Sequence, residues 1–358
     1  MPRTPCLEHP CLYRNRSQLS SHESRSLSQV GLFGGYEQTH ESIFEVCPFH
    51  PSNNINVRPG SVNRSTVYSL RAPAALRAYQ VETARRIATA LADRPNVYYQ
   101  LINVPNHSTP EWGVPIRTAI LAADPHKLIA VPEAWASAGF SHAGVINYGA
   151  FARPADAASA PVAKAALAYD ESGGLPGGRT SYRQSYWRWM LAGGSVVDNL
   201  DWSFMVGHEA GDLPDAKCHE AANAGKAARA QLAVLSTFFH ALPFVRMHPS
   251  VEWIVGADAT PLRGSVQGLI LTAPEPYTGA FAAGFVAVGG LSTIGVRIDA
   301  GRCTSVEVEW VDTQSGHATR ALVPPPPQPS ARERTMAVPP YEDDVAFRLS
   351  CLSDRASK

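Results

Sequence analysis

A repeated alternation of short strand-forming runs with helical patterns, between residues 29 and 242, most constrains the fold. The strand-forming runs lie at 29–35, 96–103, 127–131, 144–148, 166–170 and within 195–204. Helical patterns lie at 74–91, 115–123, 181–192 and 223–242. Strands that alternate with helices predict βαβ units and a parallel sheet. The pattern by itself fits a βα-barrel and an open doubly wound sheet equally.

The helical segment 74–91 has an amphipathic pattern. Its apolar residues near one face are Leu76, Tyr79, Ile87 and Leu91. Recurrence at this spacing is typical of a helix that packs one face against a sheet. We therefore expect these four side chains to point into the core.

A different pattern begins after Pro249. Short strand-forming runs lie at 268–272, 284–288, 293–298, 305–311 and 345–349, separated by Gly- and Pro-containing turns and by no helical pattern. This spacing predicts an antiparallel β-sandwich at 250–352. Residues 1–27 are polar and lack apolar periodicity, which predicts a disordered tail.

Composition excludes several classes of partner. The 31 Lys and Arg balance the 31 Asp and Glu, and no run of 18 apolar residues occurs. We therefore expect no nucleic-acid partner and no membrane span. The six cysteines are scattered without a CxxC pair, and the Gly-rich segment 173–178 lacks the Lys-Ser/Thr of a P-loop. We expect no metal and no cofactor. No secretory signal pattern occurs at the N-terminus, so the compartment stays undetermined.

Polar and aromatic residues follow the predicted strands, where a βα-barrel builds its active site. The segment 96–106 reads NVYYQLINVPN. It resembles the "NVYYEIxNEP" fourth-strand motif of retaining (β/α)8-barrel glycoside hydrolases, the cellulase-like superfamily. The resemblance implies that Asn103 binds a sugar 2-hydroxyl. It also places the acid/base glutamate at the position of Val104.

Further segments follow the order of this family along residues 28–350. They are the loop at 48–56, Glu111-Trp112, the strand end at 169–173, the helix and strand at 181–203, the exit at 244–249, and the sandwich motifs at 310–312 and 339–345. The resemblance implies a (β/α)8 TIM-type barrel at 28–249 that lacks its first two βα units. It also implies a sandwich at 250–352 of a type sometimes described as collagen-binding. Relatives of this kind are commonly exported.

The resemblance assigns roles to further residues. Glu171 matches the nucleophile at the end of the seventh strand. Tyr148 and Trp202 would stack on sugar rings, and Asn199 is a weaker substrate-binding candidate. As isolated residues, a solvated or helix-capping carboxylate and core aromatics are the plain alternatives. Val104 cannot move a proton, which a retaining glycosidase requires of its acid/base.

Two functions remain as alternatives. The first is a glycoside hydrolase that is impaired, or that draws its acid from Glu111 or His107. The second is a non-catalytic carbohydrate-binding or adhesion protein. The family's third strand already has its counterpart near residue 29, and a barrel without two strands would expose sheet edges. We therefore expect a truncated chain, or a gap filled by residues 1–27 and a partner chain.

Overall fold

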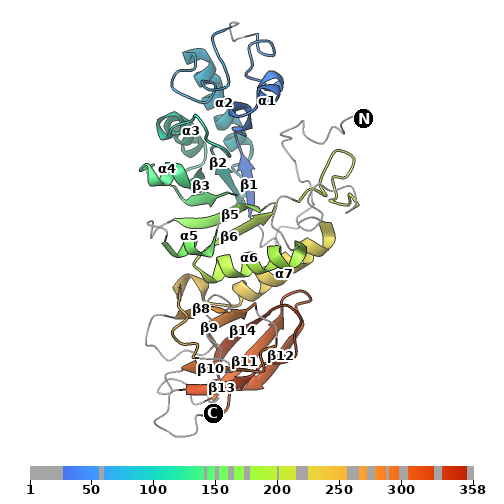
Figure 1. Ribbon diagram of the computed structural model, residues 1–358. Coiled ribbons are helices and arrows are strands. Elements are labelled where there is room, and N and C mark those ends of the chain that lie inside the picture. The colour runs from blue at the N-terminus through green and yellow to red at the C-terminus, as the bar shows by residue number, and fades with distance from the viewer. Residues whose placement is uncertain are drawn as a thin grey trace. The chain divides into compact units, whose positions relative to one another are not determined.

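The structure is a computed structural model of the 358-residue chain. It describes residues 27–55, 60–140, 143–149, 153–159, 165–172, 178–199, 201–214, 225–255, 266–271, 279–287, 290–297, 305–325 and 333–352. The tail predicted at 1–27 lies outside this range except for its last residue. Two compact units make up the chain, Met1–Tyr148 with Lys164–Ala166, and Gly149–Ala163 with Leu167–Lys358. Figure 1 shows their helices and strands.

Parallel strands follow the chain in the order β1-β2-β3-β4-β5-β6. Their bounds are β1 (Ser28–Gly31), β2 (Val97–Gln100), β3 (Ile129–Pro132), β4 (Val145–Tyr148), β5 (Ala166–Ser172) and β6 (Val196–Asn199). The helices that connect or follow them are η1 (Tyr36–Gln38), α1 (Glu41–Val46), α2 (Ala74–Ala90), α3 (Pro110–Ala123), α4 (Glu133–Ser137), α5 (Pro154–Ser159), α6 (Gly178–Leu191) and α7 (Gly225–His240). This is the order of consecutive βα units in a TIM-type barrel.

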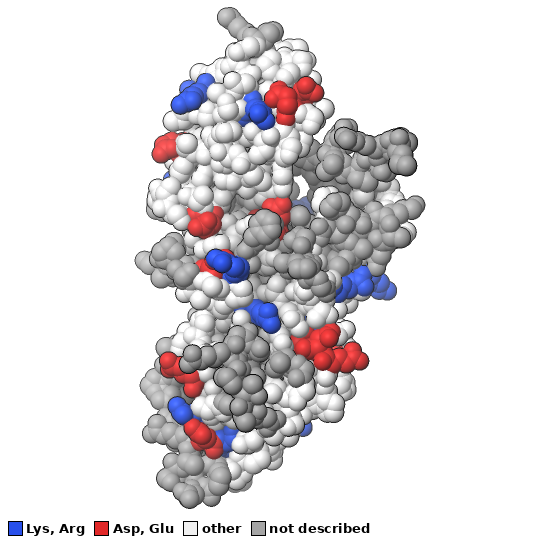
Figure 2. All heavy atoms as spheres, in the orientation of Figure 1, with Lys and Arg blue, Asp and Glu red and all other residues white. Residues whose placement is uncertain are grey.

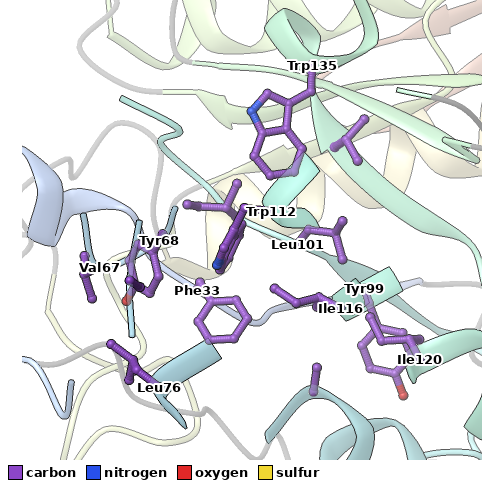
Figure 3. Packing of buried hydrophobic residues seen from close by; sticks show 14 of the residues in the cluster. Phe33, Val67, Tyr68, Leu76, Tyr99, Leu101, Trp112, Ile116, Ile120 and Trp135 are labelled. Atoms are coloured by element: carbon purple, nitrogen blue, oxygen red, sulfur yellow. The ribbon is translucent and has the colours of Figure 1, made fainter. Parts of the chain in front are cut away.

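The core of the first unit lies on the helix-covered side of the parallel strands. Tyr99 and Leu101 belong to this core, whereas Tyr98 and Gln100 point to the other face because strand side chains alternate. Figure 3 shows the buried side chains gathered around Trp112 of helix α3. The ring centroids of Phe33 and Trp112 are 5.3 Å apart. This packing holds the segment after β1 against α3.

Helix α2 packs most of its predicted face in the core. Leu76 is buried there, and Ile87 and Leu91 pack against the same core. The buried residues of α2 are Leu76, Gln80, Ala84 and Ala88, at a spacing of four. Tyr79 is 47% exposed, so its predicted place in the core is wrong. The small alanines allow close approach of the helix, and the Gln80 amide is satisfied by Val67 O at 2.8 Å and Trp112 Nε1 at 2.9 Å. A buried polar side chain with both partners in place costs little.

Antiparallel strands form the C-terminal part of the second unit. One sheet has the order β12-β11-β14-β9-β8-β7 and another pairs β10 with β13. The bounds are β7 (Met247–Pro249), β8 (Val266–Leu271), β9 (Gly279–Val286), β10 (Thr293–Arg297), β11 (Ser305–Asp312), β12 (Ala318–Leu322), β13 (Glu333–Ala337) and β14 (Val345–Leu352), with helix η4 (Phe244–Arg246) before β7. Trp253, Trp310 and Phe347 form the centre of its core.

The predicted fold class is confirmed: an α/β part with the strand order of a partial TIM-type barrel is followed by an antiparallel β-sandwich. The domain bounds at 28–249 and 250–352 stay a prediction. Within the part of the chain that the structure describes, no helix is both long and apolar enough to span a membrane.

Candidate functional site

The carboxyl ends of β1 and β2 are joined by backbone hydrogen bonds. Asn103 N donates to Phe33 O at 3.0 Å, and Val104 N donates to Gly34 O at 3.1 Å. Gly35 has a φ of +83°, and a Cβ there would lie 2.2 Å from Val104 O. Only glycine combines this φ with so close a backbone contact. Position 104, where the family motif has its acid, is therefore held tightly against the segment after β1.

The Asn103 side chain ends a chain of amide hydrogen bonds within the first unit. Asn147 Nδ2 donates to Gln29 Oε1 at 3.3 Å, and Gln29 Nε2 donates to Gln100 Oε1 at 3.1 Å. Gln100 Nε2 then donates to Asn103 Oδ1 at 3.1 Å. Gln100 and Asn147 are 4% and 5% exposed. Amides thus line a sheet face where TIM-type barrels usually place apolar layers.

Three residues of this row of hydrogen-bonded amides were not identified as site residues from the sequence. Gln100 lies in the strand motif itself, at 96–103. Gln29 and Asn147 carry no local signal, because their partners are distant in sequence. Tyr148 follows Asn147 and is half-buried at the end of β4, where alternation turns it toward the face of Ile146. Its stacking role stays a prediction.

Glu171 lies at the carboxyl end of β5, in the second unit. It is half-buried, and the preceding Asp170 is 7% exposed. The register between β5 and β6 shifts between Tyr169 and Ser172. Such an irregularity re-aims side chains at strand ends and recurs beside active sites. Asp170 is a second buried carboxyl group at this strand end that the sequence did not single out, and the nucleophile role of Glu171 stays a prediction.

Helix α6 supports this strand end. The Tyr169 ring lies 5.8 Å from the Trp189 ring and 6.1 Å from the Tyr186 ring, centroid to centroid. Both partners are buried side chains of α6. The face of β5 that carries Tyr169 is therefore fixed by aromatic packing.

The segment after β6 anchors helix α7. Asp201 accepts hydrogen bonds from Ser203 and from Gly225 N at 3.0 Å, and forms an ion pair with Arg229 at 2.6 Å. Burial acts to raise the pKa of Asp201, but these hydrogen bonds together lower it below the usual value. Trp202 is half-buried in the adjoining turn. Asn199 pairs through its backbone with Ser172, and its side chain lies outside the described residues.

The proposed replacement acids lie beside Val104 in sequence. Glu111 occupies the first turn of α3, and both Glu111 and His107 are exposed. A hydrogen bond from the Thr109 hydroxyl holds the pKa of Glu111 below its usual value. A carboxyl group with a lowered pKa is deprotonated at neutral pH and so carries no proton to donate. Glu111 is thus a poor substitute for the missing acid.

The charged side chains bear on two features, a metal centre and the distribution of charge on one face of the molecule. These residues contain no group of three or more His, Cys, Asp or Glu side chains suited to a metal ion. On the face shown in Figure 2, the blue and red side chains form small interspersed groups. Such mixing fits the formal net charge of +0.

Comparison with protein-family models and with curated proteins finds no match. Among solved structures, a glycoside hydrolase aligns with a TM-score of 0.53 and 13% identity, over 77% of this chain and 69% of that chain. A glycoside hydrolase family 5 protein from Bacteroides vulgatus ATCC 8482 aligns with a TM-score of 0.56 and 10% identity, over 78% and 68%. At sequence identities this low, the alignments show similarity of fold alone. The chain therefore has the fold of these glycoside hydrolases, as the cellulase-like motifs predict.

Proposed function

We propose that this chain is a glycoside-hydrolase-like protein that binds a polysaccharide or glycoside at the carboxyl ends of its parallel strands. The observation that carries the proposal is the placement of Asn103. It stands at the end of β2, held by backbone and amide hydrogen bonds, in the position of the family's sugar-binding asparagine. Ligands of α/β barrels bind at this end of the strands.

In this proposal Glu171 is the nucleophile of a retaining scheme, and Val104 stands where the family has its acid/base glutamate. A retaining enzyme needs a second carboxyl group about 5–5.5 Å from the nucleophile. Val104 offers none, and loss of acid/base assistance commonly costs about 10²–10⁴-fold in rate. We therefore expect hydrolysis of ordinary glycosides to be impaired or absent.

Activated aryl glycosides test this assignment, because a dinitrophenolate leaving group needs no protonation. We expect slow turnover of 2,4-dinitrophenyl glycosides by the native chain, none by Glu171→Gln, and faster hydrolysis of unactivated glycosides by Val104→Glu. Turnover that survives Glu171→Gln would exclude Glu171 as the nucleophile. An unchanged rate in Val104→Glu would show that position 104 does not face the scissile bond.

The second candidate function is carbohydrate binding without catalysis, and Val104 favours it. In that case oligosaccharides bind, Asn103→Ala weakens binding, and neither Glu171→Gln nor Val104→Glu changes any rate. Calorimetric titration with neutral oligosaccharides of several configurations separates this outcome from hydrolysis. Absence of binding to every sugar would overturn both candidates.

A further inference from the structure

The amide chain in the first unit has a direction. Each side-chain nitrogen donates to the oxygen of the next amide, from Asn147 to Gln29, to Gln100 and to Asn103. At one end, Asn147 Oδ1 is buried and has no hydrogen-bond partner in the described part of the chain. At the other end, Asn103 Oδ1 accepts the hydrogen bond from Gln100. The side-chain nitrogen of Asn103 is therefore the atom that can donate to a ligand.

We propose that Gln100, supported by Gln29 and Asn147, is a positioning residue that fixes Asn103 as a hydrogen-bond donor to its ligand. The atom that Asn103 contacts would then be an acceptor oxygen of the ligand. The identity of that ligand as a sugar rests on the proposed function, whereas the orientation of Asn103 does not.

Burial and cooperativity both support a single orientation. Rotating the Asn103 amide alone would place its N–H group against the N–H group of Gln100, and two donors cannot share a hydrogen bond. Gln100 is almost fully buried, so water does not readily replace a lost partner there. Successive hydrogen bonds also polarise one another, which strengthens a chain whose members all point the same way.

The orientation has a direct test that needs neither a variant nor a ligand. Scalar couplings transmitted across hydrogen bonds are measurable by NMR in deuterated, ¹⁵N,¹³C-labelled full-length protein. We expect a coupling between the Gln100 side-chain nitrogen and Cγ of Asn103. A coupling between the Asn103 side-chain nitrogen and Cδ of Gln100 would reverse the direction and overturn the proposal.

Substitutions of Gln100 test the consequence for binding. In Gln100→Glu the new carboxylate only accepts, so Asn103 should rotate, donate to it and present its oxygen to the ligand. In Gln100→Met the amide of Asn103 loses its fixed orientation. We expect either change to weaken binding of the sugar by about five- to tenfold, the effect of one hydrogen bond.

Fluorinated sugars separate a lost orientation from general damage. The probes are methyl glycosides of gluco, manno and xylo configuration, each paired with its 2-deoxy-2-fluoro analogue, in which the substituent can accept but cannot donate. The native protein should tolerate fluorine, whereas Gln100→Glu should discriminate against it by about a further tenfold. Gln80→Met is the control, because Gln80 is a buried glutamine that takes no part in the row of amide hydrogen bonds. This variant should lower stability and leave sugar affinity unchanged.

The outcomes distinguish the two proposals. If sugars bind the native protein but affinity is unchanged in both Gln100 variants, the positioning role is wrong and the proposed function stands. If no sugar binds, the proposed function fails, and the NMR coupling still decides the direction of the amide chain.

Discussion

Arg183 and Asp344 form a buried ion pair in the second unit, with Arg183 Nη2 2.8 Å from Asp344 Oδ2 and side chains 3% and 0% exposed. Arg183 lies on helix α6, and Asp344 directly precedes strand β14 of the sandwich. Gln184 and Thr313 also donate hydrogen bonds to Asp344. The pair therefore fastens the helix that supports β5 to the C-terminal sandwich.

Removing one partner of this pair should be strongly destabilising. Arg183→Met leaves the Asp344 carboxylate buried without its cation, which typically costs about 3–5 kcal/mol. The double variant Arg183→Met/Asp344→Leu should recover part of this loss, because no buried charge remains. Urea unfolding of the two variants measures the difference. Arg188→Met, on the same helix, is the control, and an equal loss there would show that the ion pair is not responsible.

Gly35 should tolerate alanine much less than Gly139 does. Both have a left-handed φ, +83° and +86°, so a side chain carries a similar backbone cost of about 1–2 kcal/mol. A Cβ at Gly139 meets nothing within 4 Å, whereas at Gly35 it lies 2.2 Å from Val104 O. We expect Gly35→Ala to cost about 1–3 kcal/mol more than Gly139→Ala. Equal losses in thermal or urea unfolding would contradict the close contact with position 104.

Cys47 should make the protein less stable at alkaline pH. Burial raises the pKa of its thiol from 9.0 to about 11, with a smaller contribution from Glu37. Because the folded state holds the proton more tightly, this stability is complete below about pH 9 and declines as pH rises toward 11. A shift of this size corresponds to roughly 2–3 kcal/mol. Urea unfolding at several pH values should show a shallower decline for Cys47→Ala.

Asp201 should contribute stability that is lost at acidic pH. Its pKa is lowered in the folded state, because hydrogen bonds and Arg229 outweigh the effect of burial. The stability it adds is present above the unfolded pKa of about 3.9 and is lost as pH falls below it. Asp201→Asn should flatten this part of the stability curve between pH 2 and 5, whereas the exposed Asp93→Asn should leave it unchanged. A curve unaltered by Asp201→Asn would refute the assignment.

Local sequence predicted the parallel strands, the longer helices and the strand-end positions, but not the short helices α1 and α4 or the sandwich strands β12 and β13. The β-forming run at 96–103 contains strand β2, and Asn103 and Val104 follow it as the motif requires. Glu171 likewise lies at the end of β5. Such predictions succeed because strand propensity, alternation and turn residues act over a few neighbouring positions.

Side-chain partnerships were decided by tertiary structure. Asn147 and Gln29 are 118 positions apart, and Arg183 and Asp344 are 161 apart, yet each pair shares a hydrogen bond. Apolar periodicity also selected Tyr79 for the core of α2, where the satisfied amide of Gln80 lies instead.

The sequence by itself therefore determined the alternating elements, the sandwich and the positions that carry the family motif. Strand order and register decided which amides meet on the sheet face and which charge pair is buried. The physical reason is that backbone preferences are local, whereas burial and hydrogen-bond satisfaction depend on groups brought together from distant parts of the chain.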